Sequence, residues 1–213
     1  MDLRFIEFEL AYGDGEPYTL PDVRFDVKRP DATDLPTGTE LSYRQAPGMI
    51  GLGLLEAIAD ETLLALEDPD DTDGDGISGR VNRVWDSAAN ETRIGRFGHK
   101  ASVATLREQT AAAFVNDIGI TNVMFPESDG MTDLSDVQFE DAVFFVQTIA
   151  VPAAAPREGA ARRGRVVFDT MGCATCHTPT LETGAHPIGA LANQTIHPYT
   201  DLLLHDVGDL LTD

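Results

Sequence analysis

Two cysteines and a histidine lie within one short run of the chain, Cys173-Ala174-Thr175-Cys176-His177. The two thiols are about one helical turn apart, and the imidazole follows the second thiol directly. This spacing is the attachment sequence of a c-type haem, in which both thiols form thioethers to the porphyrin and the histidine ligates the iron. We therefore expect Cys173 and Cys176 to hold one covalent haem c, with His177 as an iron ligand.

The same spacing also occurs in zinc sites and in redox-active dithiols. A structural zinc site needs a second pair of soft ligands, and the chain has no cysteines beyond the two in this run. Histidines elsewhere could complete such a site, so zinc stays open as an alternative. A cytosolic thiol oxidoreductase that uses Cys173 and Cys176 has only the spacing in its favour.

The composition limits the class of protein. The chain has 213 residues, of which 42% are hydrophobic, enough for one large or two small globular domains. It carries 36 acidic and 15 basic residues and a formal net charge of −21, so we expect no nucleic-acid partner. No apolar run reaches the ~18 residues of a spanning helix, so we expect no membrane span. The acidic surface suits a protein adapted to high salt or an ordinary acidic exported protein.

The first residues alternate in polarity like a strand and lack the basic and apolar regions of a signal peptide. Haem c is assembled outside the cytoplasm. We therefore expect a periplasmic or extracellular protein, and we interpret the chain as a piece of a longer precursor.

The polarity pattern predicts a mainly α-helical protein with a small N-terminal β region and a cytochrome c-like haem domain at the C-terminal end. Strands are predicted over 3–12, 18–20 and 23–27, and helices over 47–58, 60–66, 101–117, 133–151 and 157–170. We expect three segments: a β-rich segment over 1–45, a helical region over 46–151 and the haem domain over 157–213.

An acidic run between the second and third predicted helices has the pattern of a calcium loop. Counted from Asp71, carboxylates occupy the first, third and fifth places, a glycine the sixth, and the Ile77 carbonyl the seventh. The twelfth place is Asn82 and not the expected glutamate, so further ligands would have to come from elsewhere. The predicted Ca²⁺ ligands are Asp71, Asp73, Asp75 and the Ile77 carbonyl. The alternative is a solvated acidic loop without a cation.

Five of the basic residues follow the acidic run closely: Arg80, Arg83, Arg93, Arg96 and Lys100. Two interpretations stay open. Arginine binds carboxylates through paired donors, so these residues could contact haem propionates or an anionic substrate. Alternatively, they neutralise the acidic run that precedes them.

Five ordered runs together resemble the di-haem oxidoreductase family. They are LGLLEAI at 52–58, DGDGISGR at 73–80, GRFG at 95–98, GCATCHTP at 172–179 and YTDLLLHD at 199–206. Members of that family are exported proteins described as candidate peroxidases or thiol oxidoreductases, and they are similar to bacterial di-haem cytochrome c peroxidases. The resemblance covers nearly the whole chain.

The chain departs from the family pattern in three respects. Family members have two haem-attachment motifs, and this chain has one. Val207 stands where relatives usually have methionine, and His99 stands where they commonly have tryptophan. The resemblance implies an electron-transfer haem domain whose peroxidase-like activity depends on a partner, either a second haem domain or a redox protein. The alternative is a non-enzymatic mono-haem carrier or a calcium-stabilised binding module.

The sequence leaves the sixth iron ligand open. The candidates are His205, His197, His186, His99, Met124 and Met131. His205 ranks first among them, and a residue outside the chain or an open coordination position are the alternatives.

Overall fold

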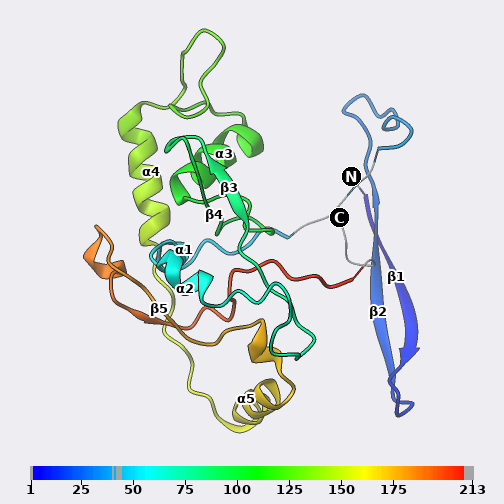
Figure 1. Ribbon diagram of the computed structural model, residues 1–213. Coiled ribbons are helices and arrows are strands. Elements are labelled where there is room, and N and C mark those ends of the chain that lie inside the picture. The colour runs from blue at the N-terminus through cyan, green and yellow to red at the C-terminus, as the bar shows by residue number, and fades with distance from the viewer. Residues whose placement is uncertain (1, 40, 42–44, 209–213) are drawn as a thin grey trace. The chain divides into compact units, whose positions relative to one another are not determined.

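The computed structural model describes residues 2–39, 41 and 45–208. The chain divides into two compact units, Met1–Ala46 and Pro47–Asp213, which are described separately below. Figure 1 labels the helices α1–α5 and the strands β1–β5. The three segments expected from the sequence stay a prediction.

The first unit is an antiparallel hairpin of β1 (Asp2–Ala11) and β2 (Pro17–Asp26). Phe8 pairs with Leu20 and Leu10 with Tyr18, so these side chains share one face of the ribbon. The turn between the strands closes where Gly15 adopts a positive φ of 87°. The hairpin confirms the strands that the alternating pattern predicted here.

The second unit contains five α-helices among its described residues: α1 (Leu52–Glu56), α2 (Asp60–Leu64), α3 (Leu106–Ile118), α4 (Asp136–Thr148) and α5 (Gly159–Thr170). It also contains the strand pairs β3 (Arg83–Asp86) with β4 (Glu91–Ile94), and β5 (Leu181–Glu182) with β6 (Thr195–Ile196), and the 3-10 turns η1 (Cys173–Thr175) and η2 (Gly189–Leu191). None of the helices in the described part of the chain is long and apolar enough to cross a membrane.

The prediction of a mainly α-helical protein was wrong. Helix accounts for 27% of the structure and strand for 19%, in three small sheets. The predicted helix over 101–117 begins only at Leu106, because Ala101 has a left-handed φ of 46° and Thr105 caps the first turn. After η1 the chain forms turns, η2 and the β5–β6 pair in place of the helices of a cytochrome c-like domain.

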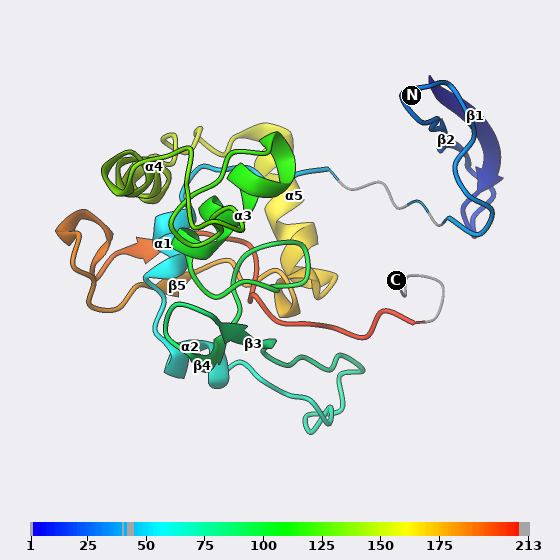
Figure 2. The same ribbon diagram turned by 90° about the horizontal axis from the view of Figure 1, so that it is seen from above.

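Glu56 joins α1 to the two longest helices of the second unit. Its carboxylate accepts one hydrogen bond from the backbone N–H of Leu106 and one from Nε2 of Gln147, both at 2.7 Å. Gly53 lies against the backbone carbonyl of Gln147, so no side chain fits between α1 and α4 at this point. Figures 1 and 2 show α1 close to the end of α4.

The largest core cluster connects distant parts of the second unit. It brings Ile58 and Leu63 of the α1–α2 region against Ile94 of β4 and against Leu181 and Ile196 of the β5–β6 pair. The segment that follows the Cys-His run therefore packs on elements that precede it by more than eighty residues. Two smaller clusters lie around α3 and α4: Phe97, Leu106 and Val146, and Ala111, Phe139 and Val143.

Candidate functional site: the Cys173–His177 turn and the acidic loop

The predicted haem-attachment residues form a tight turn directly after α5. Gly172 ends the helix with a φ of 77°, which favours glycine, and η1 then carries Cys173. The backbone N–H of His177 donates to the carbonyl of Cys173 at 2.9 Å, so the run closes one helical turn. Both thiols are free and half-buried. The local fold thus provides the one-turn spacing that two thioethers to one porphyrin require.

The imidazole of His177 is fixed through one of its two nitrogens. Nδ1 lies 3.0 Å from the backbone carbonyl of Tyr199. A carbonyl can only accept, so Nδ1 carries a proton, and in the neutral ring Nε2 is then the unprotonated nitrogen. This is the tautomer that a metal-binding histidine adopts when a backbone carbonyl orients its ring.

The side chain of Tyr199 anchors the same carbonyl to α5. Its hydroxyl accepts hydrogen bonds from Arg157 at 2.7 Å and from Arg165 at 3.0 Å. Its ring packs edge-on against Phe168, with 5.7 Å between the ring centroids, and Phe168 lies 6.4 Å from the ring of His177. The residues that surround His177 therefore support one another.

The environment of Cys176 does not favour a reactive thiolate. Burial raises the pKa of the Cys176 thiol, and the carboxylates of Asp201 and Asp75 raise it further. Redox-active dithiols need the opposite, a thiolate stabilised by positive surroundings. In the described part of the chain, neither cysteine belongs to a group of three or more side chains that could hold a metal ion. These observations weaken the dithiol and zinc interpretations.

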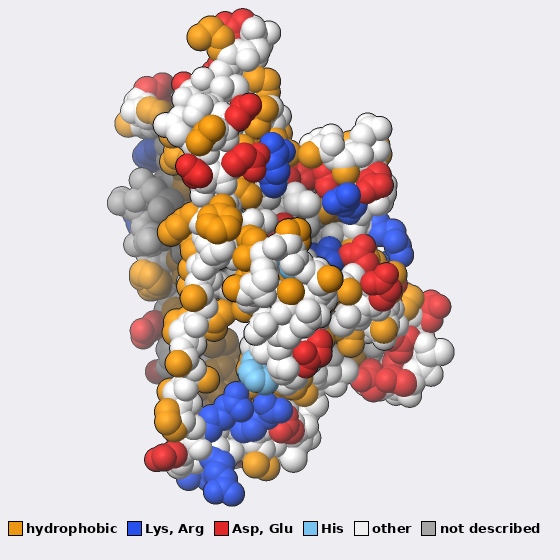
Figure 3. Space-filling view, turned by 90° about the vertical axis from the view of Figure 1, so that its left-hand side faces the viewer, with side chains coloured by type: hydrophobic (Ala, Val, Ile, Leu, Met, Phe, Trp, Pro, Cys, Tyr) orange, Lys and Arg blue, Asp and Glu red, His pale blue; other side chains and the backbone are white. Residues whose placement is uncertain are grey.

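Helix α5 presents an apolar surface beside the Cys-His turn. None of its residues is buried, and Val166, Val167 and Met171, which follows the last turn, are 59%, 51% and 74% exposed. Figure 3 shows a cluster of basic side chains with a histidine beside it at the lower part of the side of the molecule that it views. Two free thiols, one unprotonated imidazole nitrogen and an uncovered apolar surface are the groups that a covalent haem needs, so the residues fit this cofactor.

The first-ranked candidate for the sixth ligand, His205, is engaged through both nitrogens. Nδ1 donates to the carbonyl of Ser78 at 2.7 Å, and Nε2 contacts the carboxylate of Asp201 at 2.8 Å. Binding iron would break at least one of these contacts. In the described part of the chain, none of the six candidates forms a hydrogen bond or ring contact with His177.

The acidic loop assembles a different set of carboxylates from the predicted one. Oxygens of Asp68, Asp71 and Asp73 lie within 4.8 Å of one another, and the Asp75 carboxylate does not belong to this group. Asp68 was missed because it precedes the counted pattern. An antiparallel backbone bridge between Asp68 and Gly79 joins the two ends of the loop, so Asp68 is part of it. Hydrogen bonds from Thr72 lower the pKa of the Asp68 carboxyl.

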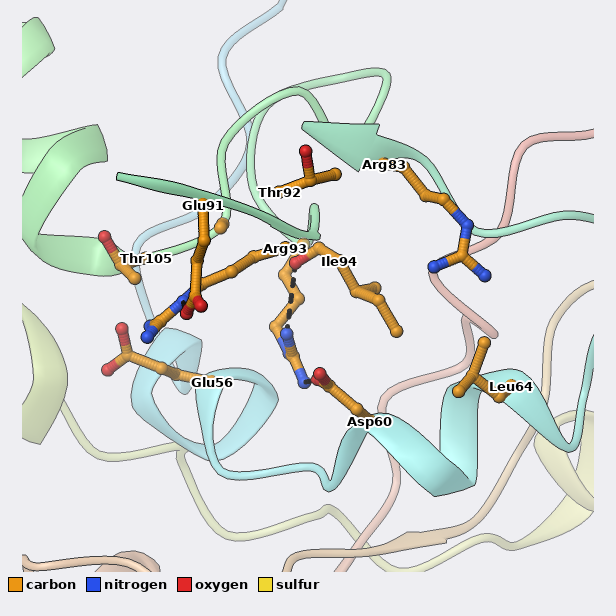
Figure 4. Close-up of a pocket in the computed structure, with 11 residues that line it drawn as sticks. Glu56, Asp60, Leu64, Arg83, Glu91, Thr92, Arg93, Ile94 and Thr105 are labelled. Atoms are coloured by element: carbon orange, nitrogen blue, oxygen red, sulfur yellow. Dashed lines mark hydrogen bonds and ion pairs between the residues drawn. The ribbon is translucent and has the colours of Figure 1, made fainter. Parts of the chain in front are cut away.

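Three of the five basic residues line a 440 Å³ cleft. Arg96 pairs with Asp60 at 2.6 Å, and Arg93 pairs with Glu91 at 2.8 Å. In Figure 4, Arg93 points towards Glu91 at one end of the cleft and Arg83 lies at the other end near Leu64. The acids that pair with Arg93 and Arg96 are not those of the acidic loop.

Comparison with known proteins identifies the family. A family model described as "Di-haem oxidoreductase, putative peroxidase" matches residues 22–139 and 127–213, which include all five runs noted in the sequence. No curated protein and no solved structure gave a significant match. Membership of a di-haem family implies that the protein binds haem. The chain belongs to the di-haem oxidoreductase family, as its five ordered runs predicted.

Proposed function

We propose that this chain is the electron-transfer haem domain of an exported di-haem oxidoreductase. It holds one haem c through thioethers at Cys173 and Cys176, with His177 as an iron ligand. The observation that carries the proposal is the contact of His177 Nδ1 with the Tyr199 carbonyl, which leaves Nε2 unprotonated beside two free thiols. Its partner is a second haem domain or a redox protein, where peroxide or another oxidant is reduced.

The protein contributes attachment, orientation and electrostatics. When bound, the haem supplies one-electron chemistry at its iron. The Tyr199 carbonyl makes the His177 imidazole a stronger electron-pair donor by accepting a hydrogen bond from its Nδ1–H. Arg157 and Arg165 hold the Tyr199 hydroxyl and thereby fix the residue that carries this carbonyl. Val166, Val167 and Met171 provide exposed apolar surface beside the turn, on which a porphyrin would pack.

The haem proposal is tested on protein fused to an export signal and produced together with a cytochrome c maturation system. We expect a mass increase of one haem per chain that survives denaturation, and a Soret band. A double variant, Cys173→Ala with Cys176→Ala, is the matched control and should be colourless. Unmodified thiols in the matured wild type would overturn the proposal.

We also propose that the acidic loop binds Ca²⁺ through Asp68, Asp71 and Asp73. Hard oxygen ligands suit this ion, and three carboxylates so close together repel one another without a cation. The Asp75 carboxylate and the Ile77 carbonyl stay predicted ligands that would have to join the group.

The calcium proposal is tested by thermal unfolding. A ligand that binds only the folded state adds about 2.7 kcal/mol to the free energy of unfolding at a hundred times its Kd. Ca²⁺ should therefore raise Tm, Asp71→Asn should abolish the rise, and an unchanged Tm would contradict a tight site.

A further inference from the structure

The segment from Tyr199 to His205 connects the acidic loop with the Cys-His turn. At its start, the Tyr199 carbonyl accepts a hydrogen bond from Nδ1–H of His177. Two residues later, the Asp201 carboxylate contacts Nε2 of His205 at 2.8 Å. Nδ1 of His205 in turn donates to the carbonyl of Ser78, at the end of the acidic loop, at 2.7 Å. Together with the backbone from Tyr199 to Asp201, these three contacts connect Ser78 to His177.

The central pair of this chain of contacts is sheltered from solvent. The Asp201 side chain is 7% exposed and that of His205 is 18% exposed. The second oxygen of Asp201 accepts from the backbone N–H of Leu203 at 3.0 Å. Removing one partner of such a pair leaves a buried polar group without its hydrogen bond, which is unfavourable. His205 and Asp201 therefore constrain each other strongly.

The backbone of the segment needs support from outside itself. Tyr199 and Leu202 have left-handed φ values of 53° and 61°, which residues other than glycine adopt at a cost of about 1–2 kcal/mol. Arg80 and Leu204 exchange two backbone hydrogen bonds, of 3.1 and 2.8 Å, next to His205. The His205 contacts extend this attachment to Asp201, between the two left-handed residues.

We propose that Asp201 and His205 are positioning residues for the iron ligand. They clamp the 199–205 segment to the end of the acidic loop and so hold the Tyr199 carbonyl on Nδ1 of His177. The proposal rests on the haem function proposed above. It also gives His205 a role other than that of sixth ligand.

The clamp has a consequence for the haem that a purely structural role would not have. A hydrogen bond donated by Nδ1–H makes the imidazole a stronger electron-pair donor to the iron and favours the oxidised iron. Loss of either clamp residue should therefore raise the reduction potential of the attached haem.

The test compares four haem-loaded proteins: wild type, His205→Ala, Asp201→Asn and Asp206→Asn. The last is the matched control, because the Asp206 side chain is exposed and accepts a local hydrogen bond from the backbone N–H of Gly208. We expect covalent haem in all four. The two clamp variants should favour reduction about tenfold, a rise of about 59 mV for one electron, and Asp206→Asn should match the wild type.

Two further arms keep the outcomes distinct. If His205→Ala does not fold, His205→Gln replaces it, since glutamine keeps a donor for one of the two acceptors and should give a smaller rise in the same direction. Unchanged potentials in loaded Asp201→Asn and in the loaded His205 variant would overturn the clamp. A wild type without covalent haem would overturn the proposed function instead.

Discussion

Glu108, the third residue of α3, shows how one side chain limits stability at neutral pH. In the described part of the chain its Oε2 atom is buried without a hydrogen-bond partner. Burial raises the pKa of the Glu108 carboxyl, and the carboxylate of Asp86 raises it further. The folded state therefore disfavours the ionised form of this group.

This shift predicts a pH-dependent effect of Glu108→Gln. Because the pKa of Glu108 is raised on folding, its stabilising contribution is complete below the unfolded value of 4.5 and is lost as pH rises through the folded value. The variant should be more stable than wild type at about pH 8, with a smaller advantage at about pH 4. Urea unfolding at both pH values measures this. Asp141→Asn, at an exposed position of α4, is the control, and a pH-independent difference for Glu108→Gln would contradict the interpretation.

Tyr199 offers a second test at a single residue. Tyr199→Phe removes the acceptor of Arg157 and Arg165 but retains the ring on Phe168 and the backbone carbonyl on His177. Each lost hydrogen bond is worth ~1 kcal/mol, so we expect a decrease of about 1–2 kcal/mol in the free energy of unfolding, with haem attachment retained. Tyr18→Phe in β2 serves as the control. Loss of haem attachment would show that the hydroxyl does more than anchor the carbonyl.

Of the candidate site residues, the sequence could predict those that a local spacing pattern identifies. Cys173, Cys176 and His177 follow from a five-residue pattern, and their roles stay predictions. The Tyr199 carbonyl could not be foreseen, because a backbone oxygen has no signature in the sequence and lies 22 residues from its partner. Asp68 was missed because only the folded loop returns it to Asp71 and Asp73.

Among the elements, α1 depends on close contact with α4. A Cβ atom at Gly53 would overlap the carbonyl of Gln147, and a backbone carbonyl cannot move aside as a flexible side chain can. Overpacking of this kind typically costs about 1–3 kcal/mol, so Gly53→Ala should lower the free energy of unfolding by at least that amount. Gly164→Ala in α5 is the control: it meets open space and should stabilise by about 0.5–1 kcal/mol. Equal Tm values for the two variants would contradict the packing.

The predicted elements differ from the observed ones for local reasons. The β1–β2 hairpin was predicted correctly because apolar and polar residues alternate over parts of both strands, on either side of a glycine-containing turn. The second strand is continuous through Pro21 and Asp22, where the sequence predicted a break. The β3–β4 hairpin was missed because strands of four residues are too short to show a clear alternation of apolar and polar residues. Its turn contains Asn90, which has a φ of 55°. The core contact of Leu181 with Ile196 depends on long-range packing that no local pattern contains.

Across the whole molecule, the net charge of −21 predicts a salt dependence of stability. Repulsion among acidic residues is strongest in the folded state, and raising the ionic strength from 0.1 to 1 M shortens the screening length from about 10 Å to about 3 Å. Tm should therefore rise with sodium chloride in the presence of a chelator. Sodium chloride is preferable to sulfate, which stabilises folded proteins generally. A constant or falling Tm would contradict the expectation.

The central claim is covalent attachment of one haem at Cys173 and Cys176, and intact mass spectrometry of the matured, exported protein tests it most directly. We predict that the mass under denaturing conditions corresponds to one haem per chain, and that peptide mapping locates this haem on the peptide that contains Cys173 and Cys176. A protein with two unmodified thiols would contradict the account.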